Sequence, residues 1–204
     1  MESKRRTQAE RSAATQEKLI AAARRLWGER GYAAVGTPEI AREAGVTRGA
    51  MYHQFADKAD LFSAVAEAVE QEVTRRLAER VAGAGVRDAA SALRAASEGW
   101  LMVSQEPEVR QILLVDGPTV LGWEGFRDLL QRYGLGLTET LLDAAMREGK
   151  LKKRPTRPLA HVVIGALNEA AMYVAAADEP AKAYEEARTI VGDLLDGLLA
   201  RAEA

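Results

Sequence analysis

The chain has 204 residues, with 28 basic and 30 acidic side chains, two histidines and no cysteine, and 48% of its residues are hydrophobic. This length suffices for one medium-sized domain or two small ones with a buried core. The absence of cysteine excludes disulfides, thiolate zinc sites and thiol catalysis. The sequence has no leading apolar segment, and no uninterrupted apolar run reaches the roughly 18 residues of a membrane span. We therefore expect a cytoplasmic protein that does not bind membranes.

The charges are unevenly distributed along the chain. Residues 1–60 hold 11 basic and 8 acidic side chains, a net charge of +3, whereas residues 61–204 hold 17 and 22, a net charge of −5. This split favours a small module that meets an anion, joined to a larger module that does not. A difference of this size also falls within ordinary surface variation, so the split alone does not decide between the two interpretations.

Helix-forming residues dominate the sequence. Alanine, leucine, glutamate and arginine are abundant, and no alternating strand pattern lasts more than a few residues. We therefore predict an all-α fold of about nine helices. Residues 1–14 are polar and basic and are expected to form a flexible arm. The predicted helices begin after Thr15, at Thr37, after Thr47 and at Asp57, followed by helices over about 88–104, from Pro107, and over about 122–148, 158–177 and 180–201.

A helix-turn-helix is predicted in residues 37–55, TPEIAREAGVTRGAMYHQF. Thr37 is a good N-cap residue with a proline at the following position, and Gly45 ends this first helix after about two turns. Thr47 then caps a second short helix, on which Met51 and Phe55 share one apolar face. Two short helices joined by a glycine-containing turn of about three to four residues form this motif.

The outward face of the second short helix carries hydrogen-bond donors and no carboxylate. Hydroxyl, guanidinium, phenol and imidazole groups bind phosphate oxygens or base edges of DNA, and small residues allow close approach to the groove. A cation follows at Lys58, beside the predicted start of the next helix. The alternative interpretation of these two short helices is an ordinary corner in a helical bundle that does not bind DNA. The residues of this face are Thr47, Arg48, Gly49, Ala50, Tyr52, His53 and Gln54.

The stretch from Thr15 to Phe62 resembles the DNA-binding domain of TetR/AcrR-type transcriptional regulators. The resemblance covers about the first quarter of the chain, and it depends on the TPEIA, AGVTRG and MYHQF segments of residues 37–55 followed by Asp57 and Lys58. It implies roles for single residues near DNA. Phosphate contacts are implied for Thr37, Tyr52, His53 and Lys58, and base contacts for Thr47, Arg48 and Gly49. The small side chain of Ala50 by itself indicates close approach to the groove.

The resemblance also implies a division of tasks along the chain. A basic arm over residues 1–14 precedes a DNA-binding domain over 15–60, and a ligand-binding and dimerisation domain occupies 61–204. The implied function is that of a repressor that binds a palindromic operator as a homodimer and is released by a small-molecule inducer. Such a dimer places its two recognition helices about 34–36 Å apart, one turn of DNA. The alternatives are a constitutive DNA-binding repressor without a ligand and a helical enzyme.

The last two predicted helices are more apolar than one neighbouring helix requires. The first is apolar on nearly all faces, and the second carries a wide leucine-rich stripe. Because terminal helices of such a chain do not easily bury every face within one subunit, we predict a two-fold four-helix interface. A fully intramolecular core is the alternative. The predicted interface residues are Val163, Leu167, Ile190, Val191, Leu194 and Leu198.

Large aromatic side chains gather in the middle of the acidic segment and predict a cavity for a partly apolar small molecule. Aromatic residues at helical spacing are also typical of an ordinary core. Asn168 lies inside an apolar stretch and needs a polar partner, which a ligand would supply. The predicted ligand-binding residues are Trp100, Trp123, Phe126, Tyr133 and Asn168.

The sequence contains no catalytic, metal-binding or cofactor-binding pattern. Its two histidines, His53 and His161, lack the spacing of metal ligands, and the chain has no phosphate-binding glycine loop and no nucleophile elbow. We therefore expect a protein that is not an enzyme and that uses neither a cofactor nor a metal.

Overall fold

The computed structural model describes residues 7–199. Within this range nine α-helices and one π-helical segment, η1, follow one another without a strand. The prediction of an all-α fold is therefore confirmed. In chain order the elements are α1 (Gln8–Arg30), α2 (Thr37–Glu43), α3 (Arg48–Gln54), α4 (Lys58–Gly83), α5 (Ala89–Val103), α6 (Pro107–Val109), η1 (Arg110–Asp116), α7 (Gly117–Arg147), α8 (Thr156–Ala176) and α9 (Pro180–Leu199).

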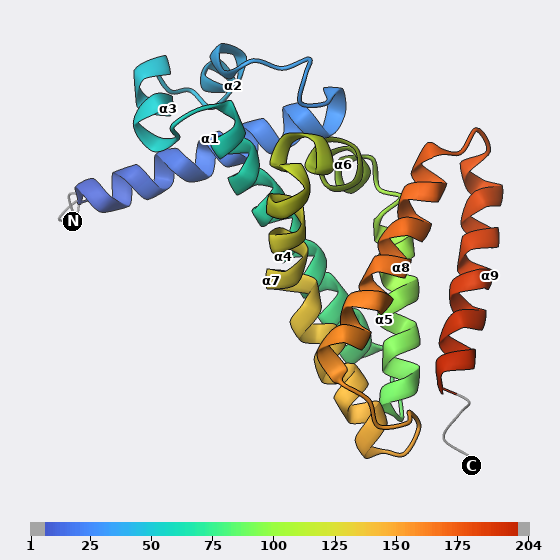
Figure 1. Ribbon diagram of the computed structural model, residues 1–204. Coiled ribbons are helices and arrows are strands. Elements are labelled where there is room, and N and C mark those ends of the chain that lie inside the picture. Colours follow the sequence, from blue (N-terminus) through green and yellow to red (C-terminus); the bar gives the residue numbers. More distant parts are fainter. Residues whose placement is uncertain (1–6, 200–204) are drawn as a thin grey trace.

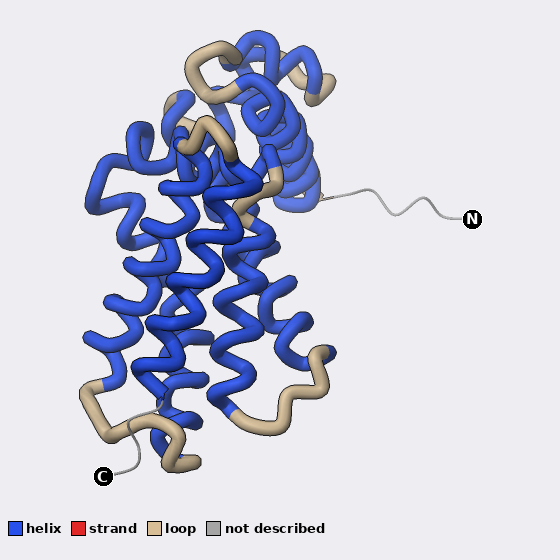
Figure 2. Tube along the Cα trace, turned by 90° about the vertical axis from the view of Figure 1, so that its right-hand side faces the viewer, coloured by secondary structure: helices blue, strands red, loops and turns tan. Residues whose placement is uncertain are grey.

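The helices form a small head and a longer body (Figure 1). Helices α1, α2 and α3 lie together at one end, and α4 runs from there into the body, where it packs against α5 and α7. Helix α8 packs along α7, and α9 lies beside α8 at the edge of the body. Figure 2 shows the body helices running side by side below the head. Helix α4 is thus shared by both parts.

An aromatic cluster forms the centre of the head. The indole of Trp27 and the ring of Phe62 are fully buried, with their centroids 5.5 Å apart, and the ring of Tyr32 meets Phe62 edge-on at 5.1 Å. The Trp27 Nε1–H donates a hydrogen bond of 3.3 Å to the Val35 carbonyl. Because Phe62 belongs to α4, this cluster fixes the first turns of α4 inside the head.

Polar contacts join the head to the elements that precede α7. The Arg24 guanidinium donates two hydrogen bonds of 2.8 Å, one to each carboxylate oxygen of Glu108. The Asp116 Oδ2 accepts hydrogen bonds from the backbone N–H of Tyr32 at 2.8 Å and from the Gln111 side chain at 3.0 Å. Head and body are therefore connected by α4 and by a set of charged and polar groups.

The first helix begins at Gln8, eight residues before the position that the sequence indicated. Thr7 and Glu10 form a capping box, in which the Glu10 N–H donates to the Thr7 hydroxyl at 3.2 Å and the Thr7 N–H donates to the Glu10 carboxylate at 2.7 Å. Thr15 lies inside the helix and its hydroxyl donates to the Arg11 carbonyl. The prediction of a flexible arm up to residue 14 is therefore wrong for residues 8–14, and residues 1–6 lie outside the described residues.

Removal of this cap tests the start of α1. We expect Thr7→Ala to lower the free energy of unfolding by about 1 kcal/mol, because the Glu10 N–H loses its side-chain acceptor. Urea denaturation followed by circular dichroism measures the change. Thr15→Ala is the matched control, since its hydroxyl only returns to a carbonyl of its own helix. Equal effects of the two substitutions would contradict the cap.

Most other helix boundaries agree with the sequence prediction. Thr47 caps α3 and Asp57 caps α4, each through a side-chain oxygen that accepts a backbone N–H. Helix α2 starts at Thr37 itself, after an N-cap at Gly36 that has no side-chain hydrogen bond. Thr37 is therefore not the cap residue that was predicted.

The middle of the chain is more continuous than expected. The short helix predicted from Pro107 continues into η1 and directly into α7. The backbone of Gly122, the predicted start of the next helix, has a φ of 67° and bends α7 there. A glycine adopts this conformation without the steric cost of a side chain, so the predicted boundary marks a kink.

By length and composition alone, α8 meets the criterion for a membrane-crossing helix. The sequence indicated no membrane span because no apolar run is long enough without interruption. In α8 the apolar residues are interrupted by His161, Asn168 and Glu169. Only 22% of its most apolar window is buried. A mostly buried core helix of a soluble protein passes the same test. Helix α8 is instead largely exposed, and its apolar surface continues onto α9, as described below.

Candidate functional site

Helices α2 and α3 form the predicted helix-turn-helix. Gly45 in the turn has a φ of 67°, and the Val46 N–H donates a 2.9 Å hydrogen bond to the Ala41 carbonyl. The side chains of Ile40 and Met51 face inward and are fully buried. Glycine is favoured at this positive φ, and the small side chain of Ala41 lets the two helices cross closely.

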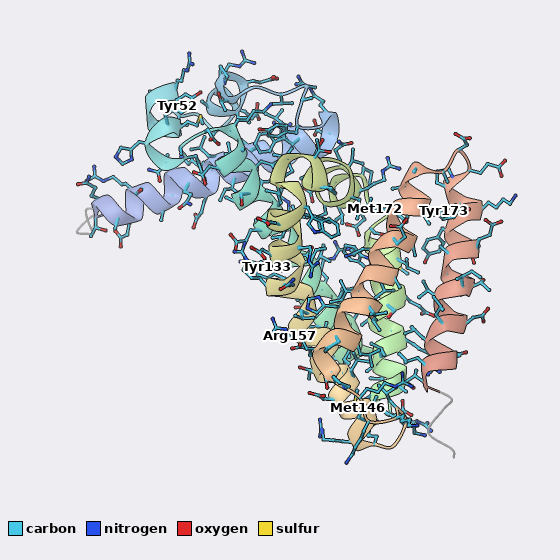
Figure 3. The ribbon with its side chains drawn as sticks, viewed as in Figure 1. Tyr52, Tyr133, Met146, Arg157, Met172 and Tyr173 are labelled. Atoms are coloured by element: carbon cyan, nitrogen blue, oxygen red, sulfur yellow. The ribbon has the colours of Figure 1, made fainter. Side chains whose placement is uncertain are left out.

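The opposite face of α3 is open to solvent and has the polar character that the sequence indicated. Thr47, Arg48, Gly49, Tyr52 and His53 are exposed and Ala50 is half-buried. The Ala50 N–H donates to the Thr47 hydroxyl at 3.1 Å. A side chain added at Gly49 would meet only that hydroxyl, at 3.9 Å. Figure 3 shows Tyr52 on α3 at the outer end of the head. This surface is convex and unobstructed, as a helix that enters a DNA groove requires.

Thr37 and Arg48 hold the phenol of Tyr52 from two sides. The Thr37 and Tyr52 hydroxyl oxygens lie 3.2 Å apart and share a hydrogen bond, and the Arg48 guanidinium lies 5.6 Å from the centroid of the Tyr52 ring. The hydrogen bond with Thr37, and then that with Arg48, lowers the pKa of Tyr52. Because the Thr37 side chain is itself buried, it orients Tyr52 and presents little surface to a phosphate.

Lys58 points toward its own chain. Its Nζ donates a hydrogen bond of 2.6 Å to the Tyr32 carbonyl and lies 3.9 Å from the centroid of the Tyr32 ring. Partial burial lowers the pKa of this ammonium group. The structure thus places Lys58 where it fastens α4 to the loop after α1, and a phosphate contact would require it to leave that position.

One contact of the head was missed in the sequence. The Gln54 amide exchanges hydrogen bonds of 2.9 and 3.0 Å with the hydroxyl of Ser12, which fixes the end of α3 against α1. Ser12 was assigned to a flexible arm, whereas the structure has it within α1. The capping box of Thr7 and Glu10 was the signal that α1 begins early enough to reach α3.

Two adjoining cavities lie in the body, an inner one between α4, α5, α7 and α8 and an outer one between α7 and α8. The inner cavity, of about 60 Å³, has Trp100 in its wall, and the outer cavity, of about 300 Å³, has Trp123 and Phe126. Asn168 lines both. Four of the five predicted ligand residues thus line one or both cavities, although the Trp123 side chain is 72% exposed.

Tyr133 is the predicted ligand residue that the structure does not bring to either cavity. Its hydroxyl donates to the Glu67 carboxylate and accepts a 2.9 Å hydrogen bond from the Gln71 amide, at the surface between α4 and α7. Burial, followed by the hydrogen bond with Glu67, raises the pKa of Tyr133. Its aromatic ring therefore joins two helices outside the cavities.

Glu70 was not predicted, although it lines the inner cavity. It belongs to α4 and follows Val69 on a helix face whose other members, Ala66 and Val73, are buried. An acidic residue among apolar residues of one helical face was the available signal. Its burial makes it the one acidic side chain among the described core residues.

The outer surface of α8 and α9 is apolar. Ile190 and Leu194 of α9 are 59% and 58% exposed, and Val162 and Tyr173 of α8 are also exposed. Two hollows of about 180 and 520 Å³ lie along the seam between the helices. Such a surface is unusual for an isolated soluble chain.

Two of the predicted interface residues are buried in their own chain. Val163 and Val191 face each other's helix, and they contribute only to the floor of the seam between α8 and α9. Leu167 and Leu198 are half-buried there, and Leu167 also lines the inner cavity. The α8–α9 face therefore consists mainly of other side chains: Val162, Ala166, Ala170, Tyr173, Ile190 and Leu194.

Two protein-family models match this chain. The model described as bacterial regulatory proteins, tetR family, matches residues 19–65. The model described as tetracyclin repressor-like, C-terminal domain, matches residues 90–198. The first match covers most of the head, including the helix-turn-helix, and the second covers most of the body.

Similar proteins include the HTH-type transcriptional regulator CymR of Pseudomonas putida, which is 45% identical over 82 residues, 40% of each chain. A crystal structure of a TetR-family transcriptional regulator from Pectobacterium atrosepticum is 32% identical, with a TM-score of 0.84 over 96% of this chain and 99% of that one. A crystal structure of RolR with the ligand resorcinol has a TM-score of 0.73 at 21% identity, over 95% of this chain and 97% of that one. This last likeness shows the fold alone.

Proposed function

Because the chain belongs to the TetR family of DNA-binding transcriptional regulators, we propose that it is a ligand-responsive repressor that binds a palindromic operator as a homodimer. It is a regulator and not an enzyme, as are the relatives that it matches. The observation that carries the proposal is the exposed donor face of α3 in the head, on a chain whose two cavities lie in the body. A DNA partner also favours a cytoplasmic location.

DNA recognition is proposed for the exposed side chains of α3. Arg48 has a planar guanidinium that suits base edges, and among the described residues it forms no ion pair that would occupy it. Tyr52 and His53 offer donors for phosphate oxygens, with Thr37 orienting the Tyr52 hydroxyl. Thr47, Gly49 and Ala50 give the N-terminal turn of α3 a low profile that allows it to approach the bases.

A homodimer is proposed through the α8–α9 face. The exposed apolar side chains continue across both helices, and a second copy related by a two-fold axis would cover them with the same surface. The result is a four-helix interface of the kind that bundles use. A dimer also presents two recognition helices, one for each half-site of a palindromic operator.

A small-molecule effector is proposed for the two cavities. Their walls are largely apolar and include Trp100 and Phe126, and the outer cavity adds charged and polar side chains at one side, among them Arg127 and Glu169. The resorcinol complex of RolR supports an effector site in a body of this fold. Residues of α4 form part of the inner wall, and from Glu70 the same helix continues for twelve residues, roughly 18 Å, to Lys58 in the head.

Helix α4 therefore provides a route by which an effector reaches DNA binding. A ligand that fits only one position of α4 shifts the separation of the two heads and disfavours the spacing that the operator needs. The expected coupling lies at about 1 to 3 kcal/mol, typical of allosteric proteins.

Selection of bound genomic fragments, repeated with candidate effectors, tests the proposal. A palindromic consensus would support the dimeric repressor, and release of that DNA by a small molecule would support effector control. Recovery of fragments without a common sequence would contradict specific operator binding. Binding that no compound alters would favour a constitutive repressor.

Tyr52→Phe tests the proposed phosphate contact of Tyr52, because it removes only the hydroxyl group. Because the ring remains over Arg48 while the hydroxyl is lost, we expect operator affinity to fall about tenfold in a gel-shift titration. Tyr184→Phe, on α9 in the body and outside the α8–α9 face, is the matched control and should leave the affinity unchanged. Sedimentation should find the same oligomeric state for both variants. Full affinity of Tyr52→Phe would remove Tyr52 from the proposed phosphate contacts.

A further inference from the structure

The carboxyl group of Glu70 has no partner in the inner cavity. The residue is 4% exposed, and its Oε2 is buried with no hydrogen-bond partner among the described residues. Burial raises the pKa of Glu70 to about 7. A buried polar group without a partner costs free energy, which a ligand that donates a hydrogen bond to it would recover.

Five other polar side chains line this cavity, namely Thr74, Ser97, Trp100, Thr138 and Asn168, and three of them donate to backbone carbonyls. The Ser97 hydroxyl donates to the Leu93 carbonyl at 2.8 Å, and the Thr138 hydroxyl donates to the Gly134 carbonyl at 3.1 Å. The indole N–H of Trp100 donates to a backbone carbonyl of α8. These groups leave the Glu70 carboxyl group available to a donor that comes from a ligand.

The charge of the cavity limits the ligand. Glu70 is the one ionisable side chain in the inner wall, whereas Arg127, His161 and Glu169 line only the outer cavity. An anionic ligand would bring a second negative charge next to Glu70 without a neighbouring cation. An ammonium ligand would require both charges to lose water. A hydroxyl group needs neither, because it donates to a carboxyl group in either protonation state.

The size and walls of the cavity indicate the rest of the ligand. The inner space of about 60 Å³ holds only a small group, and it adjoins the outer space of about 300 Å³ through the shared residues Leu130, Ile164 and Asn168. Trp100 and Phe126 offer flat apolar surfaces to a ring. A molecule with its polar end at Glu70 and its apolar part toward the outer cavity matches this arrangement.

We propose that Glu70 recognises the effector, and that the effector is a small uncharged ring compound whose hydroxyl group donates a hydrogen bond to this carboxyl group. The assignment rests on the proposed effector control and adds the chemical class of the ligand. The residue belongs to α4, so the same hydrogen bond acts directly on the helix that enters the head.

Calorimetry with p-cresol and toluene on the full-length protein tests the assignment. The two probes share one ring and differ in the hydroxyl, and we expect p-cresol to bind about tenfold more tightly. In Glu70→Leu, which fills the cavity wall with an apolar side chain, this preference should vanish. Glu70→Gln keeps an acceptor oxygen and should retain most of it. Glu67→Gln, one turn earlier on α4 and outside both cavities, is the control and should retain all of it.

Several outcomes would overturn the assignment. An equal preference for p-cresol in Glu70→Leu, tighter binding of benzoate or benzylamine than of p-cresol, or no binding of any probe at millimolar concentration would each do so. Operator gel shifts separate this failure from that of the proposed function. If p-cresol releases DNA from Glu70→Leu as well as from the unchanged protein, effector control stands and the role of Glu70 does not.

Discussion

The double substitution Ile190→Glu and Leu194→Glu is expected to convert the protein to a monomer and to lower operator affinity at least about a hundredfold. The two side chains are the most exposed large apolar groups of α9, and a two-fold axis would bring four carboxylates into one apolar interface. Without the dimer each head binds one half-site alone, and the gain from linked binding is lost. Sedimentation equilibrium measures the mass, and a gel-shift titration measures the affinity.

A matched variant separates this effect from a general effect of charge. Met102→Glu places a carboxylate on another exposed apolar side chain of the body, on α5, outside the α8–α9 face. It should remain dimeric and bind the operator normally. A dimer that persists in the double variant would refute the interface, and a monomer that retains full affinity would refute the requirement for two heads.

The stability of the protein is expected to fall as the pH rises from about 5 to about 8, through the ionisation of Glu70. Its pKa in the folded protein is about 7, above the ordinary value of 4.5. Between these values the folded chain keeps a proton that the unfolded chain has released, so each increase in pH favours unfolding. This group alone accounts for a loss of about 2.5 kcal/mol across the interval.

Glu70→Gln should remove that part of the pH dependence. The amide does not ionise, so the variant should gain stability relative to the unchanged protein as the pH rises, with the largest difference above pH 7. Urea denaturation at matched protein concentration and at four pH values measures it. Glu67→Gln, a half-exposed carboxylate of the same helix, should keep the original pH profile. A pH profile of Glu70→Gln parallel to that of the unchanged protein would contradict the buried, unpartnered state of Glu70.

The helix-turn-helix could be predicted from the sequence because its signals are local. Thr47 caps α3, Gly45 adopts the positive φ of the turn, and Met51 marks the buried face, so type and boundaries follow from neighbouring residues. The start of α1 was predicted too late, because the capping box of Thr7 and Glu10 lies in a segment whose polar composition favours a flexible arm. The π-helical continuation into α7 left no comparable signal.

The body was predictable in its helices and less so in its side-chain contacts. Apolar periodicity identifies α8 and α9, but it does not distinguish a side chain in the seam between them, such as Val163 or Val191, from one on the outer face, such as Leu194. Burial in three dimensions decides that question. Tyr133 and Glu70 show the same limit, since an aromatic residue lies at a helix surface and an acid lies in the cavity wall.

The polar joint between head and body has a consequence for the ionic conditions under which the repressor works. The paired side chains of Arg24 and Glu108 are 31% and 36% exposed, so dissolved salt screens their attraction. The proposed phosphate contacts of the head would weaken under the same conditions. Rising ionic strength would thus lower the affinity for DNA and also weaken the contacts that fix each head to its body. An effector would consequently change the separation of the two heads most strongly at low salt, because the contacts between head and body are then strongest and a movement of the body moves the head with it.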